Sequence, residues 1–323
     1  MQYVVVLIPV YNDWQSAKVL IREINNQCTL LPDKKITFLL VNDCSTEFTY
    51  AHHLEGEDSP EDVRFVDLVK NVGHQKAIAI GLSYIVEEIK PDLVVVMDAD
   101  GEDRPEDFTR LLQKNDELKG GRIVFAHRTK RQEGPLFRFF YKIYKSLFKV
   151  LTGKYISFGN FSLLPIDYAA RLVHLPEIWT HYAGAVMRSK FTYVTMPTER
   201  GTRYFGTTKM NFISLVMHGL SGISNYMDVV AVRLIVASIL LIAVSLIVLL
   251  SILIIRFFTD LAIPGWATFT SLGLVIILFQ AFFLGFFSVF LIISQKTTQQ
   301  IIPILEYRKF IFATHKLSTH AGI

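Results

Sequence analysis

The sequence predicts an α/β domain built on a mostly parallel sheet with flanking helices, followed by two transmembrane helices. Within residues 1–128, apolar runs without alternation are separated by segments of helical spacing, a pattern typical of parallel strands covered on both faces. Residues 234–255 and 267–294 are strongly apolar and contain no charged residue. Each is longer than the roughly 20 residues that a helix needs to cross a bilayer core.

The predicted elements of the domain alternate along the chain. Residues 3–8 form an apolar strand that ends at Pro9, and residues 14–25 have apolar side chains at helical spacing. Because such sheets bind ligands at the carboxyl ends of their strands, the polar clusters at 11–13, 42–43 and 98–100 are expected to converge there. The remaining predicted strands are 36–41, 63–68, 93–97 and 123–126, and the remaining helices are 74–89 and 105–115.

Residues 94–103, VVVMDADGED, place carboxylates at the end of a buried strand. Asp98 and Asp100 are hard oxygen ligands that suit Mg²⁺ or Mn²⁺ when the ion must keep positions open for substrate phosphates. The alternative is an acidic turn that caps the helix from Pro105. Five acidic residues between 98 and 106 would crowd a plain cap with like charges, so we predict a metal site.

The same sequence disfavours several other classes of protein. It contains neither a GxGxxG nor a GxxxxGK[ST] phosphate loop, which disfavours dinucleotide dehydrogenases and P-loop enzymes. It has no zinc-ligand spacing, and its net charge of +4 is modest, so no nucleic-acid partner is expected. Cys28 and Cys44 fit a reducing cytosol better than a disulfide framework.

Charge flanking the apolar segments predicts the topology. The connection 256–266 has no net charge, whereas residues 295–323 carry a net charge of +3. The excess of Lys and Arg places the domain and both termini in the cytoplasm, in a multi-pass protein of the plasma (inner) membrane. The predicted organisation is a catalytic domain at 1–209, a juxtamembrane amphipathic helix at 210–230, two transmembrane helices within 231–294 and a cytoplasmic tail at 295–323.

Six short motifs occur in order along the chain: PVYND at 9–13, VNDCS at 41–45, NVG at 71–73, DAD at 98–100, HR at 127–128 and RYFGTTK at 203–209. With this set of motifs, the chain resembles family 2 glycosyltransferases with a GT-A-type fold. Within that family, it is similar to the polyprenyl-phosphate glycosyltransferases, the group of dolichol-phosphate mannose synthase and bacterial undecaprenyl-phosphate sugar transferases. Two C-terminal transmembrane helices match its bacterial-type members.

The resemblance implies that a UDP- or GDP-linked hexose is the donor and a polyprenyl phosphate such as undecaprenyl phosphate is the acceptor. It also implies a role for individual residues. Pro9, Tyr11 and Asp13 would line the base and ribose; Asp43 would contact the base; Asp98 and Asp100 would hold the metal and diphosphate, with Glu102 beside them as a further ligand; Arg128 and Arg138 would bind the lipid phosphate; and Arg203 and Lys209 would face phosphates from the other side.

The chain departs from the family pattern at several of these motifs. Asn42 and Cys44 stand where relatives often have Asp and Gly, and Glu102 stands where Gln is common. Asn160-Phe161-Ser162-Leu163 replaces a common Asp-Phe-Arg-Leu, which removes a carboxylate and a guanidinium near the expected acceptor site.

Two segments predict contact with the membrane surface. Residues 136–151 combine basic side chains at helical spacing with many aromatic ones, so they resemble an interfacial helix. Lys142 on this helix is expected to bind the lipid phosphate together with Arg138. An ordinary surface helix is the alternative. Residues 210–230 either lie at the interface or pack against the catalytic domain.

We therefore expect the inverting transfer of one hexose to a polyprenyl phosphate, with Asp98, Asp100 and Arg128 as catalytic residues. A processive polysaccharide synthase is a second hypothesis, although the chain lacks a Gln-x-x-Arg-Trp motif. A catalytically inactive membrane scaffold is a third. Gln280, in the middle of the second apolar segment, is expected to bond to another helix, within the chain or in a homo-oligomer.

Overall fold

The structure is a computed structural model of the chain, and it describes residues 1–28, 31–46, 62–128, 135–154, 159–206, 219–259, 263, 265–297 and 300–317. It divides into two units. The sheet unit comprises Met1–Ile143, Tyr155–Asn225 and Gln300–Ile323, and the helical unit comprises Tyr144–Lys154 and Tyr226–Gln299. The two units are described separately below.

The sheet unit contains an eight-stranded mixed sheet in the order β7-β5-β6-β4-β1-β2-β3-β8. All strands except β6 and β8 run in the same direction. This confirms the predicted mostly parallel sheet. The strands are β1 (Gln2–Val10), β2 (Lys34–Asn42), β3 (Val63–Leu68), β4 (Leu93–Val96), β5 (Ile123–Arg128), β6 (Ser162–Pro165), β7 (Tyr193–Thr198) and β8 (Ile311–Lys316).

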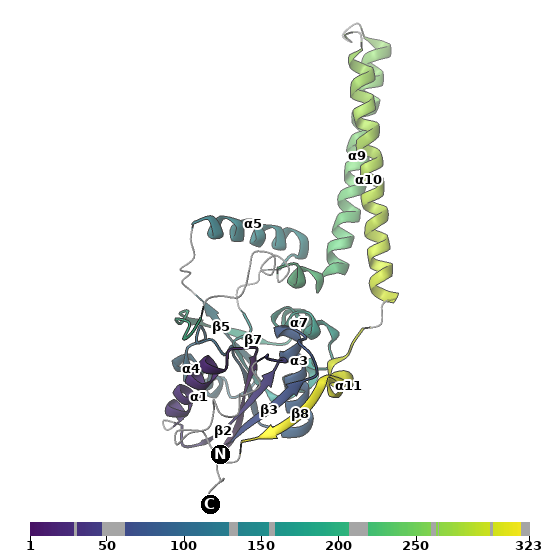
Figure 1. Cartoon of the computed structure of the whole chain (residues 1–323). Coiled ribbons are helices and arrows are strands. Elements are labelled where there is room, and N and C mark those ends of the chain that lie inside the picture. The colour runs from purple at the N-terminus through teal and green to yellow at the C-terminus, as the bar shows by residue number, and fades with distance from the viewer. Residues whose placement is uncertain are drawn as a thin grey trace, which may run out of the picture. The chain divides into compact units, whose positions relative to one another are not determined.

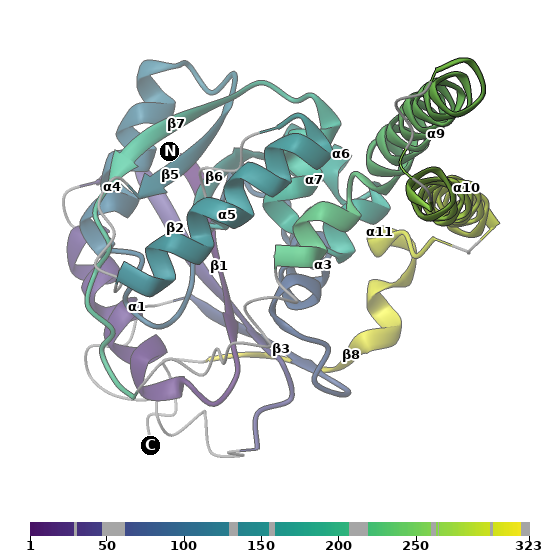
Figure 2. The same ribbon diagram turned by 90° about the horizontal axis from the view of Figure 1, so that it is seen from above.

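Helices cover both faces of this sheet (Figures 1 and 2). On one face, β1 contributes Val5 and Leu7 to a core shared with α3 and α7, and on the other it contributes Val6 and Ile8 to a core shared with α1 and α4. Since both faces of β1 are buried, its sequence shows no polar alternation. The helices are α1 (Trp14–Cys28), α3 (His74–Tyr84), α4 (Pro105–Glu117), α6 (Ile166–Leu172) and α7 (Tyr182–Ser189), with short helical turns η1 (Ile85–Ile89) and η2 (Pro176–Trp179).

The end of the chain returns to the sheet. The sequence pattern assigned residues 295–323 only to a tail, whereas the structure forms α11 (Pro303–Glu306), η3 (Tyr307–Phe310) and β8 there. β8 pairs antiparallel with β3, and Tyr307 is buried in the core. Most side chains of β8 are exposed, so the strand is held by backbone pairing rather than by an apolar pattern that the sequence could reveal.

The helical unit contains the end of α5 (Pro135–Thr152) and two long helices, α9 (Met227–Phe258) and α10 (Trp266–Thr297). The long helices contain the two predicted spans and lie side by side (Figure 1). Both are long and apolar enough to cross a membrane. Of the predicted juxtamembrane segment, residues 210–218 lie outside the described residues, and so does part of the predicted outer connection.

Candidate active site

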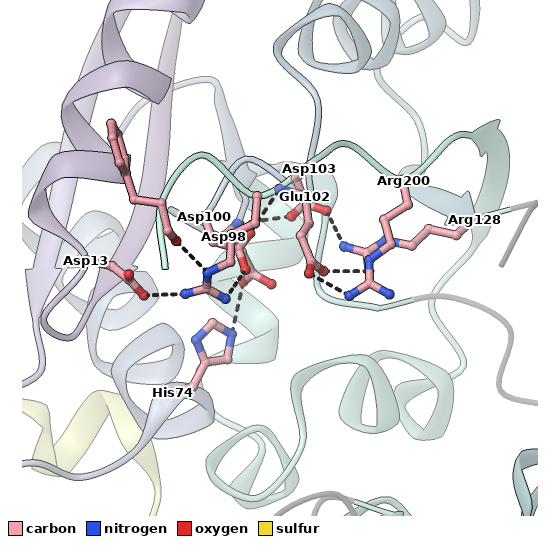
Figure 3. A network of polar contacts seen from close by, with 10 residues as sticks. Asp13, His74, Asp98, Asp100, Glu102, Asp103, Arg128 and Arg200 are labelled. Atoms are coloured by element: carbon pink, nitrogen blue, oxygen red, sulfur yellow. Dashed lines mark hydrogen bonds and ion pairs between the residues drawn. The ribbon is translucent and has the colours of Figure 1, made fainter. Parts of the chain in front are cut away.

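Polar side chains from five strand ends meet at one edge of the sheet. β1, β2, β4, β5 and β7 run in the same direction, so the residues that follow them are brought together although they are far apart in the sequence. Figure 3 shows the central part of this cluster. The contributing residues are Asp13 after β1, Asp43 after β2, Asp98 to Asp103 after β4, Arg128 at the end of β5, and Arg200 and Arg203 after β7.

A cavity of about 290 Å³ lies beside the cluster. Its lining includes Pro9, Tyr11 and Asp43, which were predicted to surround the nucleotide. The Tyr11 side chain is 41% exposed, so its ring is accessible to a ligand. The structure therefore brings these predicted residues to one hollow. The full lining is Pro9, Val10, Tyr11, Asp43, Asn71, Gly73 and His74.

Asp43 is turned inward in this cavity. Its side chain is buried, and its two carboxylate oxygens accept hydrogen bonds from the backbone N–H groups of Val72, at 2.7 Å, and Gly73, at 2.9 Å. Burial raises the pKa of Asp43, and the two amides oppose this shift. In the structure, Asp43 therefore holds the turn that begins α3, and its predicted contact with a base stays a prediction.

The departure at Asn42 has a physical explanation, whereas the one at Cys44 has none in the structure. Asn42 Nδ2 donates to Asp67 Oδ1 at 2.8 Å, and Asn42 Oδ1 accepts from the backbone N–H of Ser45 at 2.9 Å. An aspartate could not donate to Asp67, so the carboxamide suits this buried position. Cys44 has a φ of 57°, a left-handed conformation that favours the glycine expected here. On its other side, Asp67 lies 3.1 Å from Nε2 of His315 on β8.

Four carboxylates crowd the loop between β4 and α4. Asp103 Oδ2 accepts from the backbone N–H of Asp98 at 3.0 Å, and Asp100 Oδ1 accepts from that of Glu102 at 3.0 Å. Burial and the charge of Asp98 raise the pKa of Asp100 to about 6. The same two causes raise the pKa of Asp103 to about 7. The loop therefore concentrates negative charge where water is partly excluded.

Arginines from three places in the sequence balance this charge. Arg203 bridges Asp100 Oδ2, at 3.1 Å, and Asp13 Oδ2, at 2.9 Å. Arg128 lies 3.0 Å from Asp103 Oδ1 and 3.3 Å from Glu102 Oε2. Arg200 donates to Glu102 Oε1 at 2.5 Å. Glu102 thus lies between two guanidinium groups, as Figure 3 shows.

The segment 199–206 lies over the carboxylate loop. The backbone N–H of Gly201 donates to the carbonyl of Glu102 at 2.9 Å, and that of Tyr204 donates to the carbonyl of Asp100 at 3.0 Å. A Cβ atom on Gly201 would lie 2.2 Å from the backbone oxygen of Gly101. Glycine at 201 is therefore required for this close approach. We call residues 199–206 the overlying segment.

Sequence reasoning missed three residues of the cluster. His74 had no predicted role beyond the start of the helix over 74–89, yet its Nε2 lies 3.2 Å from Asp98 Oδ1 and 3.0 Å from Asn160 Nδ2. Arg200 and Tyr204 were not considered individually. The sequence signal that could have identified them is their position at or near recognised motifs: His74 follows NVG, Arg200 lies three residues before RYFGTTK, and Tyr204 is the second residue of that motif.

The pair Asp98 and Asp100 fits a divalent cation by the chemistry of its ligands. Hard oxygen donors held close together, with their negative charge incompletely hydrated, are the environment that Mg²⁺ and Mn²⁺ prefer. Glu102 is instead engaged by Arg128 and Arg200. Within the described ranges, no three His, Cys, Asp or Glu side chains are grouped to hold an ion. The predicted three-carboxylate set is thus not assembled, and a cation would depend on the two aspartates and substrate oxygens.

The remaining predicted site residues are only partly placed. Lys142 is exposed on α5. The side chain of Arg138 and the whole of Lys209 lie outside the described residues. The structure therefore brings together the described residues predicted for the nucleotide and two of the three carboxylates predicted for the metal. The role of Lys209 and most of the residues predicted for the lipid phosphate stay predictions.

Comparison with known proteins agrees with this geometry. The glycosyl transferase family 2 model matches residues 5–170, about half of the chain, and the protein belongs to this family. It is therefore a glycosyltransferase of the nucleotide-sugar type.

Several solved structures are similar to this chain at low identity. Mannosyl-3-phosphoglycerate synthase from Rubrobacter xylanophilus is 17% identical, with a TM-score of 0.47, and the match covers 70% of this chain and 73% of that one. Glucosyl-3-phosphoglycerate synthase from Mycobacterium tuberculosis, with Mn²⁺, UDP-glucose and phosphoglyceric acid, is 14% identical (TM-score 0.48; coverage 71% and 80%). A mannosyltransferase from Pyrobaculum calidifontis, with GDP-mannose and Mn²⁺, is 16% identical (TM-score 0.38; coverage 88% and 86%).

Proposed function

We propose that this glycosyltransferase moves a single hexose from a UDP- or GDP-linked donor to a polyprenyl phosphate, with inversion at the anomeric carbon. The observation that supports a nucleotide-sugar donor is the pair of contacts by which Arg203 links Asp13 to Asp100. This pair of contacts joins the carboxylate loop to the segment after β1, whose Pro9 and Tyr11 line the cavity. A nucleotide sugar has the same order of parts, with its base at one end and its diphosphate at the other.

The charges of the site suit the departure of a nucleoside diphosphate. When bound at Asp98 and Asp100, a divalent cation would neutralise the negative charge that develops on the leaving diphosphate. Arg203 already faces Asp100, so it is placed to donate charge-assisted hydrogen bonds to the same phosphates. Since ion pairs and a backbone hydrogen bond already hold Arg203 and Asp100 in place, they need little reorganisation during the reaction.

The proposed acceptor rests on a carboxylate that the chain lacks, on Arg128 and on the sequence of α5. A lipid phosphate is already anionic at neutral pH, because its second pKa is about 6. It needs no strong general base, and this chain has Asn160 where relatives often carry a carboxylate. Arg128, at the end of β5, supplies a guanidinium for the acceptor phosphate. The basic and aromatic sequence of α5 suits the headgroup region of a membrane.

The return of the chain to the sheet supports the membrane topology. β3 and β8 pair in one sheet, so residues 63–68 and 311–316 must lie on the same side of any membrane. The chain between these two strands can then cross the membrane only an even number of times. α9 and α10 are two helices that are long and apolar enough to do so, which gives an even number. We therefore propose that both ends of this helix pair face the catalytic domain's compartment. The positive charge of residues 295–323 makes that compartment the cytoplasm.

The proposal is tested by incubating the purified full chain with labelled UDP- and GDP-hexoses, undecaprenyl phosphate and Mg²⁺ or Mn²⁺. We expect a lipid-linked hexose from at least one donor, and its loss on addition of a chelator. Asp100→Ala should abolish transfer while the protein still folds and inserts. Absence of lipid-linked product with every donor would refute the acceptor, and full turnover by Asp100→Ala would refute the metal site.

A further inference from the structure

The middle of α10 carries an amide that nothing in the described part of the chain satisfies. The Gln280 side chain is exposed on the helix surface, and its amide makes no hydrogen bond to any described residue. It lies 14 residues after Trp266 and 17 before Thr297, which is about 21 Å and about 25 Å along the helix axis. A bilayer core is about 30 Å thick, so a spanning α10 places this amide near its midplane.

At that depth the amide needs a protein partner. Lipid tails offer no hydrogen bonds, and a glutamine at the midplane is too short to reach water. An outward-facing hydroxyl on the neighbouring helix shows the contrast. Ser251 on α9 donates from Oγ to the carbonyl of Ile247 at 2.9 Å, within its own helix, and so needs no partner. The side chain of Gln280 makes no such hydrogen bond within its own helix or to any other described residue.

The same face of α10 is open to close approach. Gly273 lies seven residues, or about two turns, before Gln280, and a Cβ atom on it would meet nothing within 4 Å. Small residues of this kind allow the backbones of two membrane helices to approach. We call this the Gln280 face, and its members are Gly273, Ile276, Gln280, Leu284 and Phe287.

The Gln280 face is distinct from the contact with α9. That contact buries Ala281 and Ser288 on α10 and Ser238 and Ser245 on α9. Ala281 is displaced from Gln280 by about 100° around the helix, since each residue turns the helix by that amount. A second helix can therefore pack on the Gln280 face while α9 stays in place.

We propose that the Gln280 face binds the same face of a second copy of this chain. All copies insert into the membrane in the same direction, so two α10 helices related by a two-fold axis run parallel. Gln280 then faces Gln280, and a carboxamide, which has both donor and acceptor, is electrostatically complementary to itself. The paired glycines let the two helices approach closely enough for these bonds. The proposal rests on the membrane-spanning part of the proposed function.

The test measures energy transfer between differently labelled copies of the full chain in lipid vesicles, over a range of protein-to-lipid ratios. We expect Gln280→Leu to raise the dissociation constant of the dimer roughly 3- to 30-fold, which corresponds to the free energy of an interhelical hydrogen bond in a membrane. Gly273→Ile should also weaken association, because its side chain keeps the helices apart. Gln280→Asn, which retains the carboxamide, should preserve part of it.

Ser251→Leu is the matched control and should associate like the wild type. Association of Gln280→Leu as tight as that of the wild type would overturn the proposal, and so would a wild-type chain that stays monomeric at every ratio. No substrate enters this assay. A chain that associates but transfers no sugar therefore refutes only the proposed function, whereas one that transfers sugar as a monomer refutes only this inference.

Discussion

Gly201→Ala tests whether the overlying segment must lie against the carboxylate loop for catalysis. The new Cβ atom would lie 2.2 Å from the backbone oxygen of Gly101, whereas ordinary contact begins at 3.4 Å. The two backbones must therefore separate by about 1.2 Å, the difference between these distances. A displacement of about 1 Å in a catalytic arrangement can lower the rate about 100-fold.

The same displacement has a cost in stability. It breaks or stretches the bonds from the N–H groups of Gly201 and Tyr204 to the carboxylate loop. At about 0.5–1.5 kcal/mol for each hydrogen bond, the free energy of unfolding should fall by about 1–3 kcal/mol. It also moves Arg203 away from Asp100, so the dissociation constant of the donor should rise together with the loss of kcat/KM.

The assay compares kcat/KM, donor binding and urea unfolding for wild type, Gly201→Ala and a glycine control. Gly121→Ala is the control, since its Cβ atom would meet its nearest neighbour at 3.8 Å and its φ is not in the left-handed range. We expect the control to behave as wild type. If Gly201→Ala kept kcat/KM within about threefold of wild type, close approach of the overlying segment would not be needed for catalysis.

Three further substitutions probe other parts of the site. Arg203→Ala removes charge-assisted bonds of about 1.5–3 kcal/mol and should weaken donor binding about 10- to 150-fold in titration calorimetry; unchanged affinity would refute its role. Asp43→Asn leaves one of two backbone amides without an acceptor, and should lower the free energy of unfolding by about 1–3 kcal/mol in urea. Asn42→Asp adds a carboxylate beside buried Asp67, so one of the two has a raised pKa when folded. That raised pKa favours the folded state only at low pH, so this variant should lose thermal stability relative to wild type as pH rises above about 4, and a constant difference between pH 4 and pH 8 would contradict the contact.

Much of the fold is predictable because its signals are local. The uninterrupted apolar strand at β1 and the periodic helix at α1 are written in neighbouring residues, and so are the two long apolar helices. The predicted helix over 74–89 corresponds to α3 and η1. β8 could not be predicted in this way, because its exposed side chains carry no apolar pattern and its pairing with β3 joins distant parts of the chain.

The sequence by itself determined the kinds of group that the site contains. The carboxylates of residues 98–103 follow the predicted strand 93–97. Pro9 and Tyr11 follow the predicted strand 3–8, and Asp43 follows the predicted strand 36–41. Their convergence was therefore expected from the topology of a parallel sheet. It also placed two apolar helices after the domain. These features depend on short stretches of chain, whose periodicity and chemistry can be read directly.

Only the tertiary structure decided which of these groups touch one another. It turned Asp43 inward to the backbone, placed Glu102 between two arginines and joined Arg203 to Asp13 across 190 residues. It also brought His74 to Asp98. The physical reason is that ion pairs and hydrogen bonds act over a few ångströms, so they depend on how separate strand ends meet and not on the order of residues along the chain.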